Sequence, residues 1–138
     1  MTSKIYVFLD TSFFKAAIDP KDDFYTAAKR ILDKLQKEKV TLVTSNYVLD
    51  ESFTLVRKRC GRDLVDKFRK DLSESGLVVT IVRVTVADEA GAWEWFLLDW
   101  SDLSFTDCVS FAVMKRLNLA RVATFDKHFE RAGFKIET

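Results

Sequence analysis

The sequence predicts an α/β fold, specifically a three-layer α/β/α domain with a mainly parallel sheet. Short apolar runs alternate with longer segments of helical periodicity in the order βααβααβαβαβ, which is typical of such domains. The first apolar run, Ile5–Leu9, is unbroken, as expected of a strand that is buried on both faces. The 138 residues contain no long linker, repeat or low-complexity segment, so residues 1–138 are expected to form one domain.

The N-terminal half is expected to alternate strands with pairs of helices. After the first strand, a short helix over 11–18 must end before the single proline, because the residue preceding a proline avoids helical geometry. Apolar residues at helical spacing predict a longer helix over 23–39. An apolar strand over 40–44 then leads into a helix that Ser45 can cap and that Gly61 closes.

The C-terminal half continues this alternation with single helices. An amphipathic helix over 63–75 stops at Gly76. It is followed by a β-branched strand over 77–84 and a helix over 88–100. In this helix Trp93 is expected to face the core, together with Ala90, Leu97 and Trp100, and Trp95 is expected to point the other way. A helix over 104–117 is apolar on nearly all sides and is therefore expected to be buried. The last predicted elements are a strand over 121–125, a helical turn over 126–131 and an edge strand over 134–137.

Charge and cysteine content narrow the classes of function. Lys and Arg number 22 against 21 Asp and Glu, so a net charge of +1 provides no overall field that attracts nucleic acid or anionic membranes. Cys60 and Cys108 form no CxxC pair, which indicates free thiols in a reducing compartment. The N-terminus is unlike a signal peptide, and no apolar stretch reaches the roughly 20 residues of a membrane span. A cytoplasmic protein is expected.

Three carboxylates are expected to meet at one edge of the sheet. Asp10 and Asp126 each follow a strand, and Asp107 opens the helix between two strands. Each alone is well explained as a helix cap, and Ser104 with Asp107 forms an S-x-x-D capping box. Parallel strands nevertheless point their carboxyl ends toward one edge, so the three acids should converge there. Such acids raise each other's pKa unless a cation neutralises them, which indicates a divalent metal.

A fourth acid is expected from the helix that begins after Ser45. Glu51 borders Val48 and Leu55 at the margin of the apolar face, whereas Asp50 lies farther round the helix. Glu51 is therefore favoured over Asp50 as the fourth acid, and the alternative is that Glu51 is a solvated acid at the rim of the helix.

The order and spacing of these residues resemble a known family. The segments read Asp10-Thr11-Ser12, Ser45-Asn46-Tyr47-Val48-Leu49-Asp50-Glu51, Ser104-Phe105-Thr106-Asp107-Cys108 and Thr124-Phe125-Asp126-Lys127-His128-Phe129. They resemble the PIN-domain family of metal-dependent ribonucleases, and most closely its small single-domain members of the VapC toxin type. The resemblance spans nearly the whole chain, although residues 57–104 carry no usable signature.

The resemblance implies a sheet of about five parallel strands with the first strand central. It also implies that Asp10, Glu51, Asp107 and Asp126 hold Mg²⁺ or Mn²⁺ and cleave RNA, in single-stranded or loop regions, with a metal-activated water. An all-oxygen site without histidine agrees independently, because it suits hard cations better than zinc. The expected products carry a 5′-phosphate and a 3′-hydroxyl. Family members of this type usually form homodimers and are inhibited by a cognate antitoxin protein.

Supporting roles are expected from residues near the acids. Hydroxyl and amide groups next to metal ligands commonly orient them, although capping explains Ser104 equally well. His128, the only histidine, is expected to be a surface residue outside the catalytic set, and Trp95 is a candidate for a protein contact. A basic run at the end of the helix that carries Glu51 either binds the RNA backbone or faces solvent. The positioning candidates are Thr11, Ser12, Asn46, Ser104 and Thr106, and the basic candidates are Arg57, Lys58, Arg59 and Arg62.

Two other classes of function are alternatives to the nuclease. One is a catalytically inactive RNA- or protein-binding module of the same fold. The other is a phospho-Asp receiver domain, which would need an acidic pair after the first strand, where Thr11 and Ser12 follow Asp10. A haloacid-dehalogenase-type phosphatase would need an aspartate in place of Ser12 and is excluded.

Overall fold

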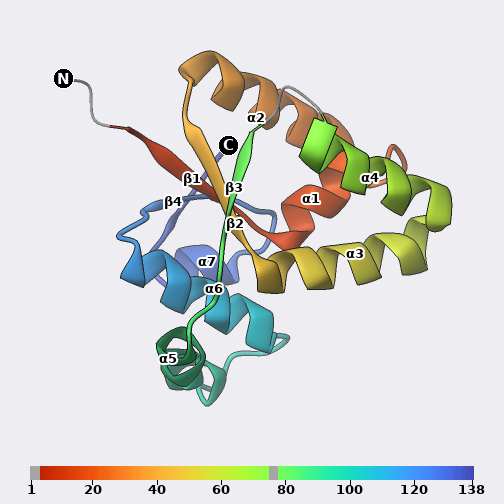
Figure 1. Cartoon of the computed structure of the whole chain (residues 1–138). Coiled ribbons are helices and arrows are strands. Elements are labelled where there is room, and N and C mark those ends of the chain that lie inside the picture. The colour runs from red at the N-terminus through yellow and green to blue at the C-terminus, as the bar shows by residue number, and fades with distance from the viewer. Residues whose placement is uncertain (1–3, 75–77) are drawn as a thin grey trace.

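The computed structural model describes residues 4–74 and 78–138, which form one parallel sheet of five strands with helices on both sides (Figure 1). The predicted helix stop at Gly76 and the first residue of the predicted strand over 77–84 lie outside the described residues. The elements are β1 (Tyr6–Leu9), α1 (Thr11–Ile18), α2 (Tyr25–Glu38), β2 (Thr41–Ser45), α3 (Asn46–Cys60), α4 (Arg62–Glu74), β3 (Val79–Val82), α5 (Val86–Phe96), α6 (Phe105–Arg116), β4 (Arg121–Ala123), α7 (His128–Arg131) and β5 (Lys135–Ile136).

The strand order places β1 at the centre of the sheet. The strands lie in the order β3-β2-β1-β4-β5, and every neighbouring pair is parallel. The predicted parallel sheet with a central first strand is thus confirmed. The chain builds outward from β1 to β3 and then returns to the other side of β1, so the order reverses between β1 and β4. Ligands of open α/β sheets bind at such a reversal, and receiver domains have the different order 2-1-3-4-5.

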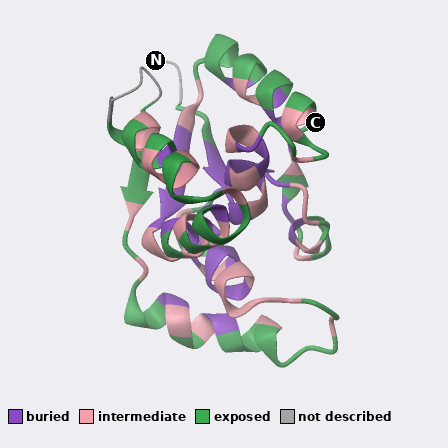
Figure 2. Cartoon of the chain, turned by 90° about the vertical axis from the view of Figure 1, so that its right-hand side faces the viewer, coloured by how far each residue is buried: buried purple, intermediate pink, exposed green. Residues whose placement is uncertain are grey.

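Helices cover both faces of this sheet. In Figure 1, α1, α2 and α4 lie to one side of the strands and α6 and α7 to the other, while α5 packs on the outer side of α6. Figure 2 shows the buried residues gathered in the strands and on the helix faces turned toward them. In β1, Val7, Phe8 and Leu9 are fully buried, whereas Ile5 and Tyr6 are exposed. The strand is therefore buried on both faces only over its last three residues, which lead directly to Asp10.

Side-chain caps determine where several helices begin. Asp10 caps α1, Ser45 caps α3, and Ser104 forms the predicted capping box with Asp107 at the start of α6. A second capping box, which joins Thr85 to Asp88, starts α5 two residues earlier than predicted. The last predicted turn also starts late, at His128, because the Asp126 carboxylate accepts the His128 backbone N–H from outside the helix.

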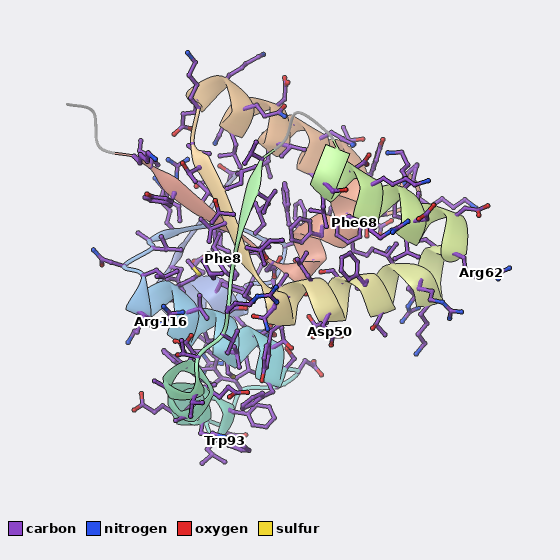
Figure 3. The ribbon with its side chains drawn as sticks, viewed as in Figure 1. Phe8, Asp50, Arg62, Phe68, Trp93 and Arg116 are labelled. Atoms are coloured by element: carbon purple, nitrogen blue, oxygen red, sulfur yellow. The ribbon has the colours of Figure 1, made fainter. Side chains whose placement is uncertain are left out.

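The expected orientation of α5 is wrong. Trp95 packs against Phe111 of α6, whereas Trp93, which was expected to pack on the core, is 49% exposed (Figure 3). The buried stripe of α5 contains Asp88, Ala92 and Trp95, and its aspartate makes the stripe look polar in the sequence. The protein contact assigned to Trp95 thus loses its basis.

A buried ion pair explains this inversion and joins α5 to α6. Asp88 is 3% exposed, and Arg116 donates to both of its carboxylate oxygens at 2.9 to 3.1 Å. Burial raises the pKa of Asp88, but the hydrogen bonds from Arg116 and Thr85 outweigh that effect and leave the pKa below its usual value. The pair helps to hold α6, the helix that carries Asp107.

Replacing Arg116 with alanine is expected to lower the free energy of unfolding by about 2 kcal/mol, because it leaves the Asp88 carboxylate buried without its cation. Urea denaturation measures this loss. Arg83→Ala removes an exposed arginine near the same contact and serves as the control. A loss no larger than that of Arg83→Ala would contradict a stabilising role for the pair.

Candidate active site

Asp10 lies at the reversal of strand order, at the carboxyl end of β1, and is 3% exposed. One carboxylate oxygen accepts the Phe13 backbone N–H at 3.0 Å and the Ser12 hydroxyl at 2.9 Å. The other oxygen accepts the Thr124 hydroxyl at 2.7 Å. Burial raises the pKa of Asp10 to about 7, although these three hydrogen bonds oppose the rise and nearby Asp107 adds to it. The carboxyl group is therefore fixed in position, but burial makes its ionised form unfavourable.

Thr124 links the ends of the two central strands and was not among the predicted site residues. It follows β4, whose Ala123 pairs with Leu9, so Thr124 stands beside Asp10 in the parallel register. Its hydroxyl donates to Asp10 and accepts the backbone N–H of Asp126 at 2.9 Å. The sequence contained this signal, because residues that follow two paired parallel strands become neighbours.

Replacing Thr124 with valine is expected to weaken binding of a divalent cation at pH 7 by about tenfold, the size of effect seen when groups that orient metal ligands are lost. The change removes a hydrogen bond that lowers the pKa of Asp10, so the carboxyl group holds its proton more tightly. Titration calorimetry with Mn²⁺ measures the effect. Thr80→Val, on the exposed side of edge strand β3, is the matched control and should bind as the parent does.

Asp107 and Asp126 approach each other beside Asp10. Asp107 is half-buried at the start of α6, where its carboxylate also accepts the Ser104 backbone N–H at 3.3 Å. Burial raises the pKa of Asp107 to about 7, and the charges of Asp126 and then Glu51 raise it further. The capping role and the acidic cluster are thus compatible, because one carboxylate serves both.

Glu51 and Asp50, which are neighbours on α3, differ in how their charges affect this cluster. The charge of Glu51 acts on Asp107 from a half-buried position on α3. Asp50 is exposed on the same helix (Figure 3). The charge of Glu51, and not that of Asp50, is therefore among the causes that raise the pKa of Asp107.

His128 joins the cluster, in contrast to the prediction that it lies at the surface outside the site. Asp107, Asp126 and His128 each offer one ligand atom, and these atoms lie within 4.8 Å of one another. The His128 Nδ1 atom is 2.7 Å from Asp126 Oδ1. The missed signal was the position of His128, which follows Asp126 by two residues and begins the helix whose first backbone N–H donates to the Asp126 carboxylate.

The other predicted positioning residues have varied surroundings. Ser12 accepts the Phe125 backbone N–H at 2.9 Å as well as donating to Asp10, so it also joins the ends of β1 and β4. Asn46 accepts the Val84 backbone N–H at 2.8 Å and fastens α3 to the end of β3. Thr11 is buried and its hydroxyl has no hydrogen-bond partner among the described residues, while Thr106 is half-buried on α6.

The predicted basic run lies away from the acids. Arg57, Lys58 and Arg59 are exposed in the last turn of α3, roughly 9 to 12 Å along the helix axis from Glu51. Arg62 follows at the outer end of the turn between α3 and α4 (Figure 3). These side chains are accessible to a long polyanion, but they do not contact the acidic cluster.

The donor set fits a hard divalent cation. Within residues 4–74 and 78–138, neither Asp10 nor Asp107 has a lysine or arginine ion-pair partner, whereas buried Asp88 has Arg116. Carboxylates with a pKa near neutrality bind such a cation readily, because the cation supplies the missing positive charge. The arrangement can therefore hold a hard divalent cation at this edge of the sheet, where ligand atoms of Asp107 and Asp126 lie within 4.8 Å of each other.

Comparison with known proteins gives a consistent family. The model of the family described as PIN domain matches residues 7–135. Two curated relatives from strains of Mycobacterium tuberculosis, both named 23S rRNA-specific endonuclease VapC20, are 38% identical over 130 residues, which is 93% of this chain and 95% of theirs.

Solved structures share the fold over nearly the full length. The crystal structure of Mycobacterium tuberculosis VapC20, described as a sarcin-ricin loop cleaving toxin, has a TM-score of 0.80 at 35% identity and matches 93% of this chain and 95% of its own. VapBC2 from Rickettsia felis, bound to a DNA fragment from its promoter, has a TM-score of 0.68 at 19% identity and matches 96% and 98% of the two chains. FitAcB from Neisseria gonorrhoeae has a TM-score of 0.63 at 20% identity and matches 96% of each chain.

In the part of the chain that the structure describes, no helix is long and apolar enough to cross a membrane. The family model covers almost the whole sequence, and a relative that is 38% identical matches 93% of it. This protein therefore belongs to the PIN domain family.

Proposed function

We propose that this protein is an endoribonuclease that hydrolyses RNA phosphodiester bonds with a divalent cation, Mg²⁺ or Mn²⁺. The observation that carries the proposal is a pair of unneutralised carboxylates at the reversal of strand order, buried Asp10 and half-buried Asp107. Family membership and the 38% identity to a 23S rRNA-specific endonuclease support it. A catalytically inactive binding module of the same fold would keep the same acids, so a cleavage assay is what separates it from the nuclease.

We assign the acids the role of cation ligands. When bound, the cation would lower the pKa of a water molecule and neutralise charge on the phosphate and the leaving oxygen. Asp10 is held by Ser12 and Thr124, which limit its rotation, and Asp107 is held by the capping box of α6. Asp126 and Glu51 complete the negative field around Asp107. Fixed ligands reduce the reorganisation that the reaction requires.

The proposed substrate is a loop in a structured RNA, and ribosomal RNA is the first candidate. VapC20, at 35% identity and a TM-score of 0.80, is described as a toxin that cleaves the sarcin-ricin loop. We propose by the same comparison that this protein is the toxin of a toxin–antitoxin pair, with a cognate antitoxin protein as its inhibitor. A single domain over 1–138 and a homodimeric assembly complete the proposal.

The basic run at the end of α3 is proposed to bind the RNA backbone beyond the cleavage site. Replacing Arg57, Lys58 and Arg59 together with alanine should weaken RNA binding and lower the slope of log affinity against log salt by about two, since each phosphate contact contributes roughly 0.7. The measurement uses the Asp10→Asn background, so that RNA stays intact during the titration.

Two lysines of α4 provide the control for this prediction. Lys67 and Lys70 are exposed but ion-paired with Asp71 and Asp66. Their replacement by alanine removes the same kind of charge from the neighbouring helix. An equal change in salt slope for both sets would contradict a specific role for the α3 run.

A cleavage assay tests the proposed function directly. The purified protein is incubated with 23S rRNA and with single-stranded and stem-loop RNAs, with Mn²⁺, Mg²⁺ or a chelator, and the product ends are mapped. Discrete cuts in loops, dependent on added cation and leaving 5′-phosphate ends, are expected. Cleavage in the chelator, or products with 2′,3′-cyclic phosphate ends, would overturn the proposal.

A further inference from the structure

The site contains a nitrogen donor in addition to its carboxylates. His128 Nδ1 lies 2.7 Å from Asp126 Oδ1, and one ligand atom from each of His128, Asp126 and Asp107 lies within 4.8 Å of the others. The Nδ1 atom is buried from solvent, yet it makes no hydrogen bond in the described structure, because its approach to the carboxylate lacks hydrogen-bond geometry. A polar atom in that position lacks a partner.

The second ring nitrogen excludes one neutral tautomer of the imidazole, the one that carries its hydrogen on Nδ1 alone. His128 Nε2 is 2.8 Å from the backbone carbonyl oxygen of Ser101. A carbonyl oxygen only accepts, so Nε2 must carry the hydrogen. In the neutral ring this leaves a lone pair on Nδ1, directed toward a carboxylate that also offers only lone pairs. In the neutral ring two such atoms at 2.7 Å repel each other, and a metal ion bound to both, or a proton on Nδ1, removes that repulsion.

The ring is also held from its outer side. Trp100 stacks on the imidazole with the ring centres 6.2 Å apart and an interplanar angle of 9°. The guanidinium carbon of Arg131 lies 4.4 Å from the centre of the Trp100 ring. The His128 backbone N–H donates to Asp126 Oδ1 at 2.9 Å, which ties the two residues together. A histidine whose distal nitrogen donates to a backbone carbonyl is the usual arrangement of a metal-bound histidine.

We propose that His128 binds the catalytic cation through Nδ1, so that the centre has mixed nitrogen and oxygen ligands instead of carboxylates alone. The inference rests on the proposed function, since it concerns the same cation. Imidazole favours transition metals, whereas Mg²⁺ prefers oxygen ligands. The mixed set therefore makes the centre selective for Mn²⁺ over Mg²⁺.

Pulsed electron paramagnetic resonance of the Mn²⁺-loaded protein tests the ligand directly. His128 is the only histidine of the chain, so a protein purified without a polyhistidine tag contains a single possible imidazole ligand. Nitrogen coupling from a directly bound imidazole is expected, and labelling histidine alone with ¹⁵N should change it to the ¹⁵N pattern. Mn²⁺ bound without this coupling would overturn the inference. This measurement needs no variant and does not depend on activity.

Binding of the two cations provides a second readout. His128→Ala is expected to weaken Mn²⁺ binding by about tenfold or more, and Mg²⁺ binding by much less. Lys127→Ala, which removes an exposed side chain next to His128, should leave both affinities unchanged. An equal loss for both cations would mean that His128 only positions Asp126, and the inference would fail. If the parent protein binds neither cation, the proposed function itself fails.

Discussion

Replacing Asp10 with asparagine is expected to lower the rate of cation-dependent RNA cleavage on the order of a thousandfold, because it removes one charged ligand of the cation and several kcal/mol of stabilisation of the reacting phosphate. The protein should stay folded. The asparagine carbonyl can accept from the Phe13 N–H and the Ser12 hydroxyl as the carboxylate does, and its amide can donate to the Thr124 hydroxyl in place of the present bond. Initial rates on a cleaved RNA measure the effect.

Two further variants make this prediction specific. Asp50→Asn removes an exposed carboxylate from α3 and should retain parent activity, whereas Glu51→Gln, one residue later, should lose most of it. Circular dichroism and thermal melting verify that each variant is folded. Parent-like cleavage by Asp10→Asn, or the reverse order of the two α3 variants, would contradict the proposed ligand set.

Much of the fold was predictable because strong local patterns agree with the global topology. The unbroken apolar run that leads to Asp10 indicated a central parallel strand, and β1 is the centre of the sheet. The caps at Ser45 and Ser104 were predictable because short polar side chains before apolar periodic segments satisfy the free N–H groups of a helix. These signals are local in sequence, and the packing of the sheet reinforces them.

The predicted orientation of α5 was wrong because a polar residue of this helix is buried and its charge is neutralised by a residue that is distant in the sequence. Asp88 gave the core-facing stripe of α5 a polar appearance, and only Arg116, 28 positions later, neutralises it. The resulting rotation of the helical wheel placed Trp95 outward and Trp93 inward, the reverse of the structure. A helical wheel contains no information about an ion pair between two helices, so this orientation could not be derived from one segment alone.

The site shows the same distinction. Sheet topology indicated that Asp10 and Asp126 would lie at one edge, and the structure brings their segments together through Thr124. The part played by His128 was not predictable, because it depends on the distances from its two ring nitrogens to Asp126 and to the Ser101 carbonyl. The sequence shows that a histidine is present at this position, but it does not show where the two ring nitrogens point.

The raised pKa values of Asp10 and Asp107 make the stability of the cation-free protein depend on pH in a defined direction. Both pKa values are raised from 3.8 to about 7, so between these limits the folded state binds more protons than the unfolded state. The free energy of unfolding therefore falls as pH rises from about 4 to 7 and then levels off. Each fully shifted group contributes at most about 4 kcal/mol. Folding lowers the pKa of Asp88, so the stability that this group contributes is lost in a separate range, as the pH falls below the pKa that Asp88 has in the unfolded state.

Denaturant unfolding in a chelator is accordingly expected to give a free energy that is several kcal/mol lower at pH 8 than at pH 5. Asp10→Asn should lose about half of that difference, because it removes one of the two shifted groups, and should be more stable than the parent at pH 8. Added Mn²⁺ binds the deprotonated carboxylates, so its stabilising effect should grow over the same range and offset the decline. A free energy that stays constant or rises between pH 5 and 8, or a Mn²⁺ effect independent of pH, would show that these carboxyl groups are not buried without a cation.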